Sequence, residues 1–467
     1  MNLHYEDDRV TLWHGDCIEV LSTLPDSSVD AVVCDPPYGL SNTAPDKVAD
    51  TIVRWAGGDR EHVPEGRGFM GRPWDSFVPP PAVWDECLRV LKPGGHMLVF
   101  AGSRTQDLMG LSIRLAGFEL RDSLAWITGS GMPKSHDVSK AIDKAAGAER
   151  EVIGRKGGRY AYGHNPEKAS LAPNGMFRWG DRHYVWTELP PNAREFFTKA
   201  AAEKGNITAP ATPEAERWAG WGTALKPSHE PVLCARKPLT GTVAANVLEW
   251  GTGALNIDAS RVAHDRQSAE WVSKWSGNGG HPRGMFGGNI GSQFGGSPSG
   301  RWPANVLLDP EAAAAMDQQS GVLKSGAHKA GQPRNAQSKS SYTLNNETTY
   351  EDAGSEGGAS RFFHVFKYQA KAPKKERPVI EREDGTKVQH PTVKPLALME
   401  WLVTLITPPG GVVLDPFAGS GTTLQAARDK GFRSIGIEAD ADHVALIHAR
   451  LEQGSGEPDL FTCGSNR

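Results

Sequence analysis

The same order of local features occurs near both ends of the chain, and it constrains the fold more than any other feature. Near the amino end, a helical pattern at residues 83–91 is followed by Pro93-Gly94-Gly95 and by a buried-strand pattern at 96–100. Near the carboxyl end, a helix with Pro395 in its first turn is followed by another Pro-Gly-Gly turn and the apolar run 412–414. Similar patterns predict strands at 29–34, 120–128 and 434–437 and helices at 108–115, 422–430 and 442–451. Strands that alternate with helices predict a doubly wound, mostly parallel α/β sheet.

The middle of the chain has a different composition. Glycine and proline contribute 53 and 33 of the 467 residues, and glycine is concentrated at 271–300, while 324–360 is polar and almost free of aliphatic side chains. Such segments form long loops rather than core elements. We therefore expect one domain built from both ends of the chain. The predicted organisation is a split domain at 1–129 and 386–455, an inserted loop and helical region at 130–228, a returning core strand at 229–240, an irregular region at 241–385 and a flexible tail at 456–467.

Charge and cysteine content argue against several classes of protein. The chain holds 51 basic and 55 acidic residues, a formal net charge of −4, which disfavours DNA-packaging proteins and polybasic membrane binders but permits a local basic face. The five cysteines are scattered and form no Cys-x-x-Cys pair, so neither a zinc site nor a disulfide framework is expected. No apolar run approaches the roughly 18 residues that span a bilayer. The acidic start at residues 1–8 does not have the pattern of a secretory signal.

A four-residue loop, Asp35-Pro36-Pro37-Tyr38, follows the predicted strand 29–34, at the position where open α/β sheets have their binding sites. A carboxylate beside a backbone carbonyl suits the exocyclic amine of a nucleobase, because the two acceptors bind both N–H groups and pull the nitrogen toward tetrahedral geometry. The prolines fix the Pro36 carbonyl, and Tyr38 offers a ring for stacking. A base bound in this way has left the double helix, which implies base flipping. A proline-rich turn capped by Asp35 explains the tetrapeptide alone equally well.

A second loop, Asp415-Pro416-Phe417-Ala418-Gly419-Ser420-Gly421-Thr422-Thr423, joins the strand at 412–414 to the following helix. Its glycines allow a ligand to approach the backbone closely, and the helix N-terminus offers N–H groups. Glu438 ends the next strand, where a carboxylate can bind two ribose hydroxyls. A dinucleotide site would need a third glycine and a P-loop would need Gly-Lys-Ser/Thr, so an adenosine-bearing ligand without a pyrophosphate fits better. A plain tight turn is the alternative.

Together the two loops resemble the catalytic and cofactor motifs of the DNA amino-methyltransferases, which transfer a methyl group from S-adenosylmethionine to N6 of adenine or N4 of cytosine. The catalytic loop comes first and the cofactor loop last, which is the permuted order of the beta group of that family. The resemblance covers residues 10–129 and 388–451 well and the middle only in patches. It implies a Rossmann-like methyltransferase fold, S-adenosylmethionine as cofactor, double-stranded DNA as partner, and a target-recognition region at 241–385.

The resemblance also assigns roles to individual residues. The implied catalytic residues are Asp35, Pro36, Pro37 and Tyr38. The implied cofactor contacts are Asp16, Cys17, Thr392, Lys394, Asp415, Phe417, Gly419, Gly421, Thr422, Thr423 and Glu438. Among these, Asp16 would lie near the adenine of the cofactor, and the segment 390–395 near the methionine carboxylate. As alternatives, Asp16 could cap a helix that begins near Ile18, and Lys394 could be a solvated lysine in the first turn of a helix.

Basic and aromatic residues alternate in the segment 361–377, a combination that suits DNA phosphates and stacked bases. The candidate DNA contacts are Arg361, Lys367, Lys371, Lys374 and Lys375. A strand with aromatic core positions and a solvated basic tail is the alternative for this segment. The glycine-rich stretch 271–300 could order on DNA or could be a simple insertion.

Three functions remain in competition. The favoured one is site-specific methylation of N6 of a flipped adenine in DNA, because residue 35 is Asp rather than Ser, with cytosine N4 as the nearest alternative. A nicotinamide-dependent dehydrogenase would leave the loop 35–38 unexplained, and a non-catalytic DNA-binding or cofactor-sensing module would predict lesions in a loop that is intact. We expect no metal and no membrane segment, a monomer or homodimer, and a modification enzyme in the cytoplasm of a prokaryotic or virus-infected cell.

Overall fold

The computed structural model describes most of the chain. The described residues are 1–453, except for 42, 67, 69–72, 130, 132–134, 156–168, 172–176, 180–181, 185–187, 189–205, 264–299, 325–355, 367–376 and 383. The chain divides into two compact units, one made of residues 1–130 and 228–467 and the other of residues 131–227. Within the described residues, no helix has the length and hydrophobicity needed to cross a membrane.

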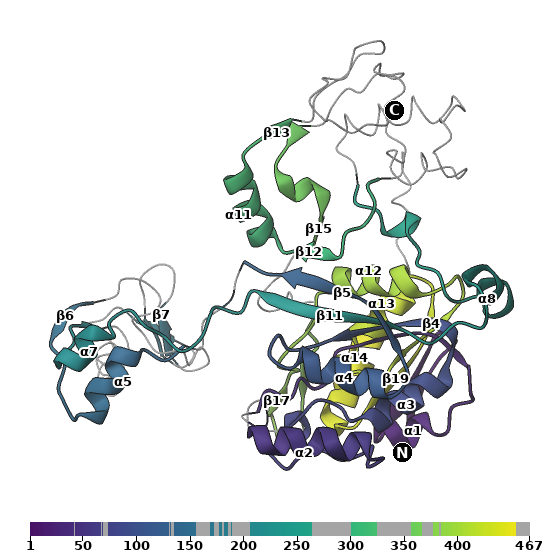
Figure 1. Ribbon diagram of the computed structural model, residues 1–467, viewed down its shortest axis with the longest axis horizontal. Coiled ribbons are helices and arrows are strands. Elements are labelled where there is room, and N and C mark those ends of the chain that lie inside the picture. Colours follow the sequence, from purple (N-terminus) through teal and green to yellow (C-terminus); the bar gives the residue numbers. More distant parts are fainter. Residues whose placement is uncertain are drawn as a thin grey trace, which may run out of the picture. The chain divides into compact units, whose positions relative to one another are not determined.

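The larger unit contains a central sheet with the strand order β1-β2-β19-β18-β3-β4-β11-β5-β12-β15 (Figure 1). The strands are β1 (Asn2–Glu6), β2 (Val10–His14), β3 (Val29–Cys34), β4 (Leu91–Phe100), β5 (Glu119–Ile127), β11 (His229–Arg236), β12 (Val306–Leu308), β15 (His364–Val365), β18 (Val412–Asp415) and β19 (Arg433–Glu438). From β2 through β19, β18 and β3 to β4, every neighbouring pair is parallel. Strand β11 is antiparallel to both β4 and β5. The sheet confirms the predicted mostly parallel α/β class.

Helices cover both faces of this sheet. The helices α1 (Cys17–Leu21), α2 (Pro45–Ala56), α3 (Pro81–Val90) and α4 (Gln106–Leu115) pack on one face, and α12 (Leu396–Ile406), α13 (Thr422–Asp429) and α14 (Ala441–Gln453) on the other. Strand β3 shows why two layers form, because its side chains alternate between them. Val32 contributes to the core that contains Trp84 of α3, whereas Val33 contributes to the core that contains Leu402 of α12. All four side chains of β3 from Ala31 to Cys34 are fully buried.

The structure corrects two details of the predicted elements. Pro93-Gly94-Gly95 does not separate α3 from a strand that begins at residue 96, because β4 already begins at Leu91. The Gly94 N–H donates to the Lys237 carbonyl over 3.1 Å and the Lys237 N–H donates to the Gly95 carbonyl over 2.9 Å, so the turn residues belong to the ladder with the chain after β11. Strand β1 was not expected, and it pairs antiparallel with β2.

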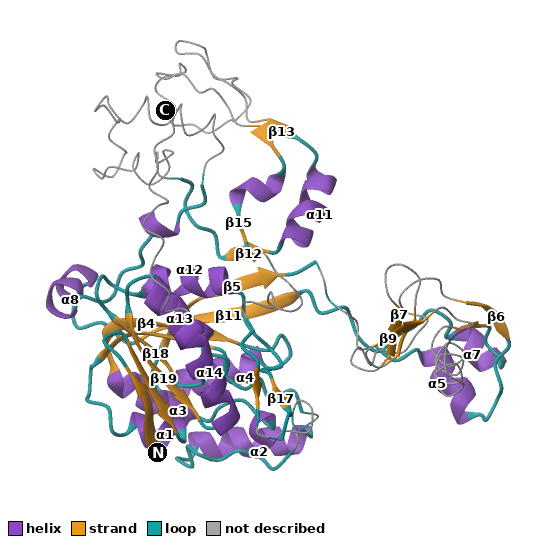
Figure 2. Ribbon diagram, turned by 180° about the vertical axis from the view of Figure 1, so that it is seen from behind, coloured by secondary structure: helices purple, strands orange, loops and turns teal. Residues whose placement is uncertain are grey.

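Shorter elements complete the larger unit (Figure 2). They are η2 (Pro73–Asp75), α8 (Val243–Trp250), η5 (Asp258–Ser260), α11 (Pro310–Ser320), β13 (Leu323–Lys324), β14 (Glu356–Gly357), η6 (Ala359–Phe362), β16 (Ile380–Glu381) and β17 (Lys387–Val388).

The smaller unit has its own buried polar centre. Its elements are α5 (Val138–Ala145), β6 (Val152–Arg155), β7 (Ala169–Leu171), β8 (Phe177–Trp179), β9 (Arg182–Tyr184), β10 (Asn206–Thr208) and α7 (Pro213–Arg217). The buried Asp143 carboxylate accepts hydrogen bonds from the Ala211 N–H at 3.0 Å and the Thr212 hydroxyl at 2.8 Å, and it pairs with Arg150 at 2.5 Å. These charge-assisted bonds join α5 to the segment that begins α7.

Candidate active site

Four acidic residues lie at one edge of the sheet. Because β2, β19, β18 and β3 run parallel, their carboxyl ends meet at the same edge. Asp35 follows β3, Asp415 ends β18, Glu438 ends β19, and Asp16 comes two residues after β2. The fold therefore brings the two loops identified in the sequence together, although they are almost four hundred residues apart in the chain.

At this edge, Asp35 belongs to a cluster of four polar side chains, the Asp35 cluster, with Tyr38, Glu230 and Lys394. The Tyr38 hydroxyl lies 2.7 Å from Oδ1 of Asp35 and 2.6 Å from Oε1 of Glu230. The Lys394 ammonium lies 3.2 Å from Oδ2 of Asp35, 2.7 Å from Oε1 of Glu230 and 2.9 Å from the Tyr38 hydroxyl. Every member thus contacts at least two others, so the cluster holds Asp35 in one orientation.

The Asp35 cluster is partly shielded from water, and this changes its acid–base properties. The side chains of Asp35 and Glu230 are 24% and 26% exposed, and that of Lys394 is 11% exposed. Burial raises the pKa of Asp35, Lys394 lowers it and Glu230 raises it again, with a net pKa above the ordinary value. Burial and the neighbouring Asp35 carboxylate raise the pKa of Tyr38 well above its usual range. For Lys394, burial lowers the pKa, but the two carboxylates raise it more.

The backbone of the loop is fixed from two sides. The Thr105 hydroxyl donates to the Tyr38 carbonyl over 2.6 Å, and the Gly39 N–H donates to Oδ1 of Asp75 over 3.0 Å. Gly39 has φ +65°, and a Cβ atom there would lie 2.6 Å from the backbone nitrogen of Val78. Only glycine fits this position without strain. These contacts keep the rigid Pro36-Pro37 segment and Tyr38 in place before any ligand binds.

The second loop has the close backbone turns that its glycines predicted. Gly419 and Gly421 have φ +52° and +74°, and α13 begins directly after Gly421. The Gly419 N–H donates to Oε2 of Glu438 over 2.8 Å, and the Asp440 N–H donates to Oε1 over 2.9 Å. Glu438 therefore fixes the loop and faces the same edge as Asp415.

Asp415 is a buried carboxyl group, with 2% of the residue exposed. Burial raises its pKa to about 7, although the Thr423 hydroxyl and the Phe417 N–H donate hydrogen bonds that lower it. The carboxylates of Asp35 and Glu438 raise the pKa further. A cation bound at this edge would favour the ionised form of Asp415. Thr422 and Thr423 are also buried, at 4% and 3% exposure.

The other residues expected to bind the cofactor differ in their contacts and in their exposure to solvent. The Asp16 carboxylate caps α1, accepting from the Ile18 N–H at 2.8 Å and the Glu19 N–H at 3.3 Å, as in the alternative interpretation of the sequence. Burial raises the pKa of the Cys17 thiol to about 12, so this side chain stays neutral. Thr392 is exposed. Lys394 is neither solvated nor directed away from the catalytic loop, because its ammonium belongs to the Asp35 cluster.

Glu230 is the member of the Asp35 cluster that the sequence did not reveal. It is the second residue of β11 and precedes Pro231 in an apolar run. Because β11 is antiparallel to β4, its first residues lie at the carboxyl edge of the parallel strands. An acidic residue at the start of a buried strand was the available signal, but its meaning depends on the strand direction.

The expected DNA contacts are mostly not described. Lys367, Lys371, Lys374 and Lys375 lie outside the described residues. The Arg361 guanidinium donates to the carbonyls of Gly357 and Gly358 at 2.6 and 2.7 Å and lies 4.3 Å from the ring of Phe362. It therefore supports the local backbone in this structure.

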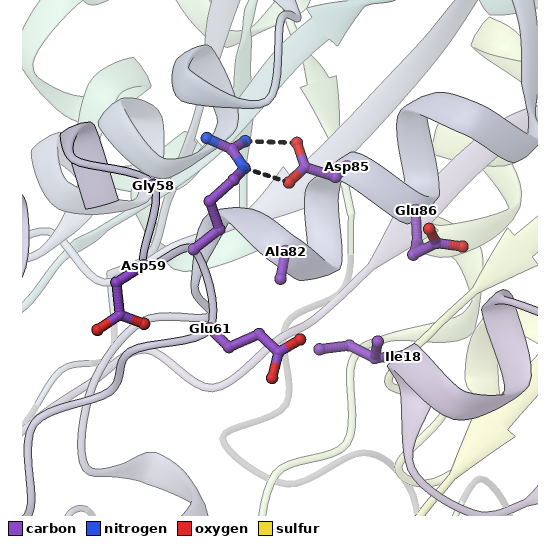
Figure 3. A pocket seen from close by; sticks show the side chains of 8 residues that line it. Ile18, Gly58, Asp59, Glu61, Ala82, Asp85 and Glu86 are labelled. Carbon is purple, nitrogen blue, oxygen red and sulfur yellow. Dashed lines mark hydrogen bonds and ion pairs between the residues drawn. The ribbon is translucent and has the colours of Figure 1, made fainter. Parts of the chain in front are cut away.

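A separate hollow lies beside α1 and α3 (Figure 3). It has a volume of about 410 Å³ and is lined by Ile18, Gly58, Asp59, Arg60, Glu61, Ala82, Asp85 and Glu86. Two of these lining residues, Arg60 and Asp85, form an ion pair. None of its lining residues belongs to the Asp35 cluster. Among the described residues, no group of three or more His, Cys, Asp or Glu side chains could hold a metal ion.

The doubly wound sheet and the acidic edge define an α/β protein with a candidate ligand site at the carboxyl ends of its strands. Residues 183–449, more than half of the chain, match the model of the N6/N4 family of DNA methylases, described as "DNA methylase". The chain belongs to this family.

Several known proteins share parts of the sequence. The putative methylase YubD of Escherichia coli K12 is 40% identical over 79 residues, which are 15% of this chain and 35% of that protein. The type II methyltransferase M.ScaI of Streptomyces caespitosus is 40% identical over 72 residues, 15% of this chain and 24% of that one. The matched segments thus span about a third or less of these relatives.

Two solved structures that match over most of the chain have low TM-scores. The M1.HpyAVI–SAM complex is 14% identical with a TM-score of 0.35, and the match covers 95% of this chain and 98% of that one. The cytosine-N4-specific PvuII DNA methyltransferase is 12% identical with a TM-score of 0.40, covering 96% and 90%. Both TM-scores are below 0.5, so the description of the fold rests on the sheet itself.

Proposed function

We propose that this protein transfers a methyl group from S-adenosylmethionine to the exocyclic N6 of an adenine that has flipped out of double-stranded DNA. The observation that carries the proposal is the meeting of the Asp35–Tyr38 loop and the Asp415–Gly421 loop at one edge of the sheet. The first offers acceptors for an amine and the second a turn for an adenosine-bearing ligand. Membership in the N6/N4 family agrees with this pairing.

The charges at the edge support S-adenosylmethionine as the ligand. Asp415 and Glu438 are acidic, which suits the cationic sulfonium and ammonium groups and opposes a pyrophosphate. When bound, this cofactor supplies an electrophilic methyl group. A Cβ atom on Gly421 would lie 2.9 Å from Ile447, so the turn before α13 depends on glycine for its close packing.

The chain's own residues would place and deprotonate the target. The Asp35 carboxylate and the Pro36 carbonyl accept the two N–H bonds of the amine, and Tyr38 stacks on the base. Bringing nitrogen and methyl carbon to about 3–3.5 Å supplies most of the rate enhancement. The amine becomes acidic only as the methyl group arrives, so a carboxylate with an ordinary or moderately raised pKa is a sufficient acceptor.

Transfer of label from S-adenosylmethionine to DNA tests this proposal. Double-stranded DNA of mixed sequence is incubated with the protein and methyl-labelled cofactor, digested, and separated into nucleosides. We expect the label in N6-methyl-2′-deoxyadenosine. Label in N4-methylcytosine would show that the target is cytosine N4 rather than adenine N6. Cofactor binding without transfer to any DNA would favour a non-catalytic module.

We also propose the permuted arrangement, with the catalytic half of the domain first and the cofactor half last. The inserted region at 241–385 would read the DNA sequence. The natural role would be the modification arm of a restriction-modification system in the cytoplasm. Sequencing of methylated sites in DNA treated with the protein would identify the recognition sequence, and methylation without sequence preference would contradict a role in such a system.

A further inference from the structure

The hydrogen bonds of the Asp35 cluster need one proton more than its groups supply at their ordinary ionisation. Lys394 has three protons for its three contacts, with Asp35, Glu230 and Tyr38. Tyr38 has one proton, but its hydroxyl lies 2.7 and 2.6 Å from two carboxyl oxygens. A tyrosine hydroxyl can donate to only one of them. The other contact is a hydrogen bond only if that carboxyl group is protonated and donates to the tyrosine oxygen.

The net charge of the cluster leads to the same conclusion. Two carboxylates and one ammonium leave one uncompensated negative charge in a place that is mostly shielded from water. Asp415 at the end of β18 adds a further acidic group that interacts with Asp35. A proton held between the two carboxyl groups removes this uncompensated charge. The pKa of Asp35, which burial and the neighbouring Glu230 carboxylate raise, agrees with this arrangement.

We propose that Glu230 is a positioning residue of the reaction, which shares one proton with Asp35 through the Tyr38 hydroxyl. This inference rests on the proposed methyl transfer. In the ligand-free protein the pair holds the shared proton, and the cluster is neutral. A cationic ligand at the neighbouring loop makes the ionised pair more favourable, so the proton leaves to solvent. Asp35 is then a free acceptor for the amine.

The proton balance of the transfer follows from these states. The amine nitrogen uses its lone pair to form the new N–C bond, the C–S bond breaks with its electron pair on sulfur, and the positive charge moves to the nitrogen. The methylated nitrogen then loses its extra proton to the Asp35 carboxylate. Tyr38 connects this proton to Glu230, and the pair again holds one proton. The positive charge of the donor is thus replaced by the proton on the pair.

Proton release on ligand binding tests the inference without any turnover. Binding of S-adenosylmethionine and of the uncharged thioether product S-adenosylhomocysteine is measured by calorimetry at pH 7 in buffers of different ionisation enthalpy. The sulfonium ligand should release up to one more proton than the thioether. Glu230→Gln should reduce this difference by at least half, because a single carboxyl group remains. Glu249→Gln, at an exposed position on α8, is the matched control and should leave it unchanged.

A second variant tests the same inference in case Glu230→Gln disturbs folding. Tyr38→Phe preserves the ring but removes the hydroxyl that joins the two carboxyl groups, and it should reduce the difference in the same way. Asp415→Asn measures the contribution of the other raised carboxyl group separately. An undiminished difference in both Glu230→Gln and Tyr38→Phe would overturn the inference. Absence of binding of either ligand to the unaltered protein would instead refute the proposed function.

Discussion

Asp415→Asn should make the ligand-free protein more stable at neutral and alkaline pH. Burial raises the pKa of Asp415 from 3.8 to about 7, so the folded protein binds a proton that the unfolded chain releases. The stability that this group contributes is fully present below pH 3.8 and is lost as the pH rises through about 7. Each pKa unit corresponds to about 1.4 kcal/mol, so the loss amounts to about 4 kcal/mol. Asparagine is neutral at every pH, and its side-chain oxygen can still accept from the Phe417 N–H.

Urea unfolding at pH 5 and pH 8, followed by the fluorescence of buried tryptophans such as Trp84 and Trp126, measures this effect. At pH 8 the variant should exceed the unaltered protein by about 2–4 kcal/mol, and at pH 5 the gain should shrink by at least half. Asp8→Asn is a suitable control, because Asp8 is exposed on the turn between β1 and β2. An Asp415→Asn variant with the same or lower stability at pH 8 would refute the argument that burial raises the pKa of this carboxyl group.

Three other substitutions give further tests. Asp35→Ala should abolish methylation but leave the affinity for S-adenosylmethionine within about tenfold in calorimetry, because the residue acts on the amine. Weaker binding of S-adenosylmethionine, with methylation retained at saturating cofactor, would contradict that role. Gly39→Ala forces an alanine Cβ against the Val78 backbone at φ +65°, and should lower the unfolding free energy by about 1–3 kcal/mol, measured by urea unfolding; unchanged stability would show that the turn can relax. Leu402→Ala should cost about 2–5 kcal/mol, because this side chain is fully buried between α12 and the sheet; a cost below 1 kcal/mol in the same assay would contradict its core position.

The sequence predicts the fold well where local signals and burial agree. Strand β3 is apolar and ends at two prolines, and α13 is preceded by two glycines with positive φ, so both elements were recognisable from short segments. The start of β4 was not, because Pro93-Gly94-Gly95 is drawn into the ladder by hydrogen bonds to Lys237, far away in the chain. Strand β1 owes its place to pairing with β2 rather than to a buried apolar pattern.

For the site, the sequence identifies the residues on loops but not the partners that fix them. Asp35 and Tyr38 stand in a recognisable tetrapeptide, whereas Glu230 reaches them only because β11 enters the sheet antiparallel. Lys394 was assigned to the cofactor by resemblance, but its contacts with Asp35 and Glu230 depend on how the segment before α12 passes β3 and β11. Such long-range proximity is a property of topology, which the local sequence does not contain.

The most direct test of the central claim is the identity of the nucleoside that the protein modifies. DNA treated with the protein and S-adenosylmethionine is digested and its nucleosides are identified by mass spectrometry, in parallel with DNA treated with Asp35→Ala. The account predicts N6-methyladenine in the first sample and none above background in the second. Equal yields of methylated base in the two samples would contradict it. So would the absence of any methylated base when the unaltered protein binds the cofactor.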